Sequence, residues 1–69
     1  MSRKDDVIQM MHDKGFYETS TVITGHDGKQ LYSVKFIRIS DNKEGPTETY
    51  DDITEAYTQA AVQALLHCF

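Results

Sequence analysis

The sequence has little of what usually cross-links a small protein. Cys68 is the only cysteine, so the chain cannot form an internal disulfide or a zinc site built on two or more cysteines. Tryptophan is absent, and Pro46 is the only proline. Stability must therefore come from one apolar core, and association into a homodimer stays open as a way to extend it.

Long hydrophobic runs are also missing. Every apolar stretch is far shorter than the roughly 20 residues that a membrane-spanning helix needs. Residues 1–6 lack the apolar segment of a secretory signal peptide. We therefore expect a cytoplasmic protein with no membrane association and a reduced thiol.

The length and composition indicate one folded unit. The chain has 69 residues, which is the usual scale of a single domain, here 1–69. Hydrophobic residues make up 39% of the chain, which is too large a share for a disordered segment. The sequence is therefore read as one small folded domain.

The net charge of −4 is unevenly distributed along the chain. Lys43 is the only lysine or arginine in residues 40–69, which hold six acidic residues. Such a field repels phosphate backbones and attracts basic surfaces. The candidate binding residues surround one predicted strand-to-helix turn, and they are Glu48, Tyr50, Asp51, Asp52 and Glu55. An ordinary solvated surface is the competing interpretation.

Helical periodicity marks both ends of the chain. Residues 3–14 carry an apolar stripe after a capping signal at Ser2, and Gly15 is placed to end the helix. Residues 52–67 form the second predicted helix, with Asp52 as its cap. One side of this helix is apolar and rich in alanine, which lets it lie close to a sheet: Ile53, Ala56, Tyr57, Ala60, Ala61, Ala64, Leu65 and Cys68.

The middle of the chain has the composition of strands. Residues 16–24 are rich in aromatic and β-branched side chains, and residues 31–39 alternate. Residues 25–28, Gly-His-Asp-Gly, predict a tight hairpin turn between them. The apolar pair Ile37 and Ile39 breaks the polar face of the second strand, which predicts either a bulge near Phe36 or partial cover of that face. Residues 40–46 read as a polar loop and 47–50 as a short edge strand.

The element order predicts an α+β fold. A helix, three strands and a helix are most simply arranged as a three-stranded antiparallel sheet with two helices packed on one face. Tyr32, Val34 and Phe36 then meet the alanine-rich side of the second helix. This arrangement buries the apolar stripes of both helices.

This α-β-β-β-α order resembles the double-stranded RNA-binding domain. Residues 53–65, with their Glu-Ala and Ala-Ala pairs, resemble that family's alanine-rich second helix. The resemblance implies a duplex RNA ligand. The family carries a lysine cluster at the start of this helix, whereas residues 50–55 here contain no lysine and three acidic residues, Asp51, Asp52 and Glu55. The charge therefore disfavours phosphate binding.

The same ending is similar to that of small phage-encoded α-β sandwich proteins. Residues 55–65, Glu-Ala-Tyr-Thr-Gln-Ala-Ala-Val-Gln-Ala-Leu, carry this similarity. Such proteins are mostly accessory factors or inhibitors without chemistry of their own. The similarity implies a regulatory protein that acts by binding.

No residue pattern indicates an enzyme, a cofactor or a metal site. The sequence contains no nucleophile elbow, phosphate-binding loop or zinc-protease helix. Neighbouring helical residues such as His67 and Cys68 point about 100° apart and do not readily share one metal ion. We therefore expect a non-catalytic module that binds a basic protein surface through its acidic residues, with a duplex RNA-binding domain as the alternative.

Overall fold

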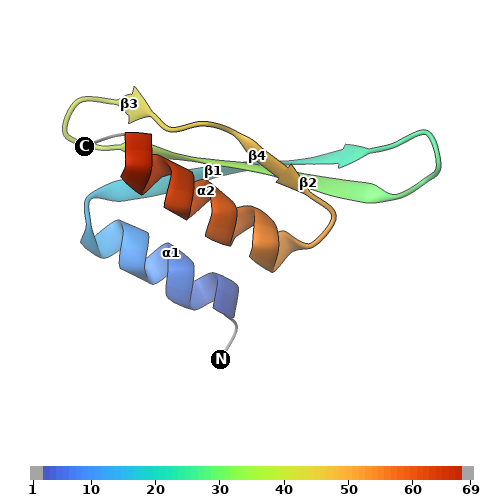
Figure 1. The fold of residues 1–69 in the computed structure, drawn as a ribbon, viewed down its shortest axis with the longest axis horizontal. Helices are drawn as coiled ribbons and strands as arrows, with labels where there is room; N and C mark the ends of the chain where they lie inside the picture. Colours follow the sequence, from blue (N-terminus) through green and yellow to red (C-terminus); the bar gives the residue numbers. More distant parts are fainter. Residues whose placement is uncertain (1–2, 68–69) are drawn as a thin grey trace.

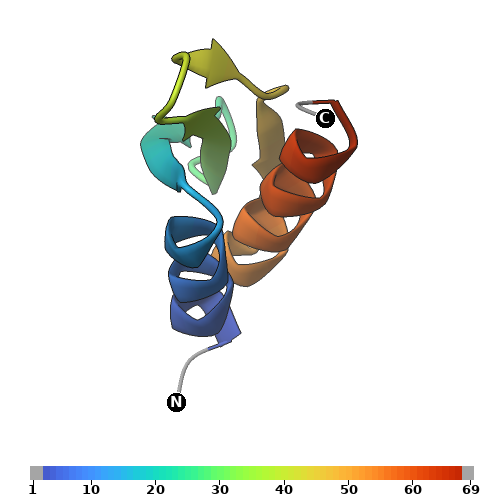
Figure 2. The ribbon, with the colours of Figure 1, turned by 90° about the vertical axis from the view of Figure 1, so that its left-hand side faces the viewer.

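The computed structural model describes residues 3–67, which form two helices and an antiparallel sheet (Figure 1). The elements follow in the order α1 (Arg3–Asp13), β1 (Phe16–Thr24), β2 (Gln30–Arg38), β3 (Lys43–Glu44), β4 (Glu48–Tyr50) and α2 (Ile53–His67). Both helices lie on the same side of the sheet (Figure 2), which confirms the predicted α+β architecture. Neither described helix is long and apolar enough to cross a membrane.

Strand β2 lies at the centre of the sheet. All nine of its residues pair with β1, and its other edge pairs with β3 and β4. Ile37 lies opposite Glu44, whereas Val34 lies opposite Glu48. Three residues, 45–47, therefore span the distance that two residues, 35–36, span on β2, which is the pattern of a β-bulge.

This bulge corrects two details of the sequence prediction. The predicted loop 40–46 contains the short strand β3, so the third strand has two parts rather than one. The extra residue lies in the partner of β2, and β2 itself pairs without interruption along β1. Ile37 is only 8% exposed on the sheet face away from the helices, so partial cover of that face explains its apolar character.

The core lies between α2 and the helix-side face of the sheet. Val34 and Phe36 of β2 are fully buried there, and the ring of Phe36 meets that of Tyr57 edge-on at 6.4 Å. The small side chains of α2 that complete the core confirm the predicted alanine face, and they are Ala56, Ala60, Ala61 and Ala64. Tyr32 packs against this core and is half-buried.

Helix α1 closes the core from the side of β1. Met11 is fully buried, and Val7 and Ile8 pack against the same cluster. The helix ends at Asp13, and Gly15 follows it with a φ of +88°, the left-handed conformation expected of a glycine just after a helix. Ser2, the predicted cap of this helix, lies outside the described residues.

The β1–β2 connection is not the tight hairpin turn that the sequence predicted. Five residues, 25–29, separate the two strands, and only Gly28 has a positive φ. The Asp27 carboxylate accepts a hydrogen bond from the Lys29 amide at 3.1 Å, which closes the turn locally. This hairpin extends past the helices on the side where both helices begin (Figure 1).

Candidate functional site

The predicted binding residues come together where β4 leads into α2. Glu48 and Tyr50 belong to β4, Asp51 and Asp52 form the turn, and Glu55 lies in the first turn of α2. Asp51, Asp52 and Glu55 are exposed, whereas Glu48 and Tyr50 are half-buried. We call these five residues the β4–α2 acidic surface.

Tyr50 contributes both to the core and to this surface. Its ring packs against the core cluster, and its backbone lies opposite that of Tyr32. Its hydroxyl donates a hydrogen bond to Glu48 Oε1 at 3.4 Å. Burial, and next the charge of Glu48, raise the pKa of Tyr50, so the hydroxyl remains a donor at neutral pH.

Asp52 occupies the position at which α2 begins. Its backbone carbonyl accepts a hydrogen bond from the Ala56 amide at 3.0 Å, which is the first bond of the helix. Glu55 accepts a hydrogen bond from the Gln59 side chain at 3.1 Å, one helical turn later. Asp52 and Glu55 therefore lie near the positive end of the helix dipole, which stabilises their charges.

The carboxylates of the β4–α2 acidic surface form no ion pair within residues 3–67, whereas three other carboxylates do. The three ion pairs found among residues 3–67 join Glu18 to His12, Glu44 to Lys35, and Asp41 to Arg38. None of them uses an acidic residue of the β4–α2 acidic surface. The negative charge at this turn is therefore not neutralised within the described part of the chain.

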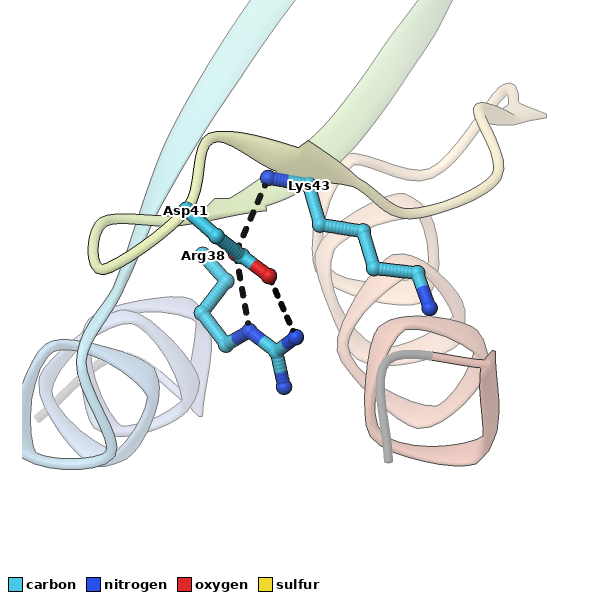
Figure 3. Close-up of polar contacts among 3 residues, drawn as sticks. All are labelled: Arg38, Asp41 and Lys43. Atoms are coloured by element: carbon cyan, nitrogen blue, oxygen red, sulfur yellow. Dashed lines mark hydrogen bonds and ion pairs between the residues drawn. The ribbon is translucent and has the colours of Figure 1, made fainter.

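The Asp41 ion pair closes the turn between β2 and β3 (Figure 3). Asp41 accepts hydrogen bonds from Arg38 Nε at 3.0 Å and Nη2 at 2.6 Å, and its Oδ1 also accepts one from the Lys43 amide at 3.2 Å. Chiefly through the hydrogen bond from Arg38, the pKa of Asp41 is lowered from 3.8 to about 2. The turn is thus a structural feature that holds β3 in place.

A second polar region lies on the sheet face that the helices leave open, and the sequence analysis missed it. A hollow of about 180 Å³ opens there, lined by Thr19, Thr21, Ser33, Lys35 and Thr47. The Ser33 and Thr49 hydroxyls share a hydrogen bond of 2.9 Å across β2 and β4. The threonines read as strand formers in the sequence, and only the strand register brings these hydroxyls into one area.

His12 lies near the end of α1 and His26 in the hairpin turn, so these two histidines belong to different parts of the described chain. His12 Nε2 lies 2.7 Å from Glu18 Oε1, so this ring links the end of α1 to β1. His26 is exposed in the hairpin turn. Residues 3–67 contain no cluster of three or more histidine, cysteine or acidic side chains that could hold a metal ion. Cys68 lies outside the described residues.

Comparison with known proteins identifies no family for this chain. Protein-family models, curated proteins and solved structures give no significant match. What the structure defines is a small α+β domain with the order α-β-β-β-α.

Proposed function

We propose that this protein is a non-catalytic binding module that acts through the β4–α2 acidic surface. Its partner is a protein that carries a basic surface patch. This function is regulatory or accessory in kind, because the module changes what its partner can bind and carries out no reaction of its own.

The observation that supports this proposal is the unneutralised charge at the β4–α2 turn. Asp51 and Asp52 are exposed and form no ion pair with another described residue, and Glu55 projects from the same turn. Opposite charges across an interface speed association and select the partner. The half-buried ring of Tyr50 adds an amphipathic group of the kind that is enriched at interfaces.

The test is capture of partners from cells of the source organism with two versions of the protein as bait. The first is the unmodified chain, and the second carries Glu48→Lys and Asp51→Lys. Both substitutions lie outside α2, so we expect the variant to keep the circular dichroism spectrum of the unmodified protein. Partners that bind the acidic surface are lost from the variant.

A matched control separates this surface from net charge in general. Asp6→Lys with Asp13→Lys makes the same change in charge on exposed positions of α1. Partners that use the β4–α2 acidic surface stay bound to this control. If both variants lose the same partners to the same extent, or neither loses any, the surface is an ordinary solvated one.

A duplex RNA-binding function is the second candidate, and one observation favours it. The hairpin turn and the first turns of both helices lie toward the same end of the molecule (Figure 1). The RNA-binding domains that this chain resembles use their first helix and first hairpin to contact the minor groove of RNA. A gel shift with duplex RNA at low salt tests it, because phosphate binding weakens steeply as salt rises. Under this function the Glu48→Lys and Asp51→Lys variant binds RNA more tightly, whereas under the first it loses its partner.

A further inference from the structure

The two edges of the sheet are built very differently. The edge formed by β3 and β4 consists of strands of only two and three residues, separated by a bulge that contains Pro46. Short strands, bulges and proline are devices that prevent a sheet edge from pairing with another chain. The opposite edge is β1, a continuous strand of nine residues without proline, lysine or arginine.

The second half of β1 is the part that remains open. Residues 20–24, Ser-Thr-Val-Ile-Thr, are all exposed, because the hairpin extends here past the helices (Figure 1). Val22 is 54% exposed and Ile23 is 45% exposed, on opposite faces of the strand. In the described structure only β2 pairs with β1, so the outer backbone groups of this segment have no strand partner.

We infer that residues 20–24 of β1 pair antiparallel with the same residues of a second copy of this chain. The two-fold axis passes at Val22, and the two sheets become one continuous sheet. Val22 then faces Val22 of the second copy, Thr21 faces Ile23, and Ser20 faces Thr24. This pairing is an isologous interface, in which each copy contributes the same surface.

The strand register is the argument for a second copy as the occupant. Val22, Tyr32 and Tyr50 lie opposite one another along one row on the helix-side face of β1, β2 and β4. The two-fold axis at Val22 brings this row against the same row of the second copy. Apolar side chains therefore meet where the two sheets join. A strand with charged or large polar residues would interrupt the row at this point.

Charge also permits the self-pairing. Glu18 is the only charged residue of β1, and the axis at Val22 places it opposite position 26, beyond the end of the strand. The two Glu18 carboxylates therefore do not oppose each other. The β4–α2 acidic surface lies at the other edge of the sheet, so the interface brings no acidic surface against another.

The segment is short, so we expect a weak dimer that forms with rising concentration. Sedimentation of the full chain from about 10 μM to about 1 mM should show a monomer–dimer equilibrium. Val22→Lys should weaken the dimer by about tenfold or more, because two ammonium groups then meet at the axis. Leu66→Lys is the matched control, since Leu66 is also an exposed apolar residue and lies on α2, away from β1.

Mixing two variants that carry opposite charges at position 22 gives the decisive measurement. Val22→Lys and Val22→Glu should each be monomeric alone and should form a heterodimer when they are mixed, while Leu66→Lys dimerises like the unmodified chain. If Val22→Lys loses its circular dichroism spectrum, Ile23→Lys is used in its place. Its complement is Thr21→Glu, because Ile23 of one copy faces Thr21 of the other. A chain that is monomeric throughout this range, or a dimer that neither substitution weakens, overturns the inference.

Discussion

Gly45 and Ala64 approach so closely that a methyl group on Gly45 would lie 3.0 Å from both the Cα and the Cβ of Ala64. The same methyl group would lie 3.2 Å from the Phe36 carbonyl oxygen, which accepts a hydrogen bond from the Gly45 amide at 2.9 Å. Gly45, which directly follows β3, therefore sets how closely the third strand and α2 can pack. Glycine is the residue that this contact permits.

Gly45→Ala tests this contact. We expect it to destabilise the domain by about 2 kcal/mol, because the added methyl group must displace either the backbone of α2 or that of the bulge. Urea unfolding followed by circular dichroism measures the change. In the double variant with Ala64→Gly, part of the clash is removed, so the loss should be smaller than the sum of the two single losses. Strict additivity would show that the two residues do not press on each other.

The Arg38–Asp41 ion pair predicts an acid dependence of stability. The folded pKa of Asp41, about 2, lies below its usual value of 3.8, so the charged carboxylate favours the folded state. This contribution is fully present above about pH 5 and is lost as the pH falls through 4 toward 2. The difference in unfolding free energy between the unmodified chain and Asp41→Asn should therefore shrink over this range. A difference that stays constant from pH 6 to 2 would contradict the pairing.

Asp52→Ala tests the start of α2. Loss of the Asp52 side chain should cost about 1 kcal/mol of stability, because the N-cap position loses a preferred residue and the helix dipole loses a nearby negative charge. Asp51→Ala, one residue outside the cap, is the matched control and should change the midpoint of thermal unfolding little. Equal effects of the two substitutions would place the cap elsewhere.

Ala60→Asp tests the packing of α2 against the sheet. Ala60 is fully buried, so the substitution places a carboxylate without a partner in the core and should unfold the domain. Val62→Asp introduces the same side chain on the exposed side of the same helix and should leave the fold intact. The dispersion of amide signals in a proton NMR spectrum distinguishes the two outcomes. A folded Ala60→Asp variant would refute the assignment of the buried face.

Most of the fold follows from local patterns in the sequence. The change from a two-residue to a 3.6-residue apolar period after Tyr50 locates α2, and the β-branched run from Phe16 locates β1. The predicted strand 31–39 is shifted from β2 by one residue at each end. These elements are predictable because their signals lie within the elements themselves.

The remaining features depend on register and contact between distant segments. Strand β3 has two polar residues, Lys43 and Glu44, and forms only because β2 offers it a free edge. The pair Gly45-Pro46 reads as a loop signal, although Gly45 is buried against α2.

The sequence located the acidic residues of the candidate site at their turn, whereas the hydrogen bond from Tyr50 to Glu48 is visible only in the structure. The hollow on the open sheet face is lined by residues of β1, of β2 and of the segment between β3 and β4, so no single stretch of sequence reveals it.

Because the third strand is divided into β3 and β4, one of its parts can open locally without the other. Strand β3 joins β2 through two residue pairs and is fastened by the Arg38–Asp41 turn, whereas β4 joins β2 through three pairs and continues directly into α2. The bulge between them interrupts the hydrogen-bond ladder, so β3 can detach while β4 and the helix stay in place. We therefore expect the amide hydrogens by which β3 bonds to β2 to exchange with solvent through smaller fluctuations than those by which β4 bonds to β2. The bulge therefore separates local unfolding at β3 from local unfolding at β4.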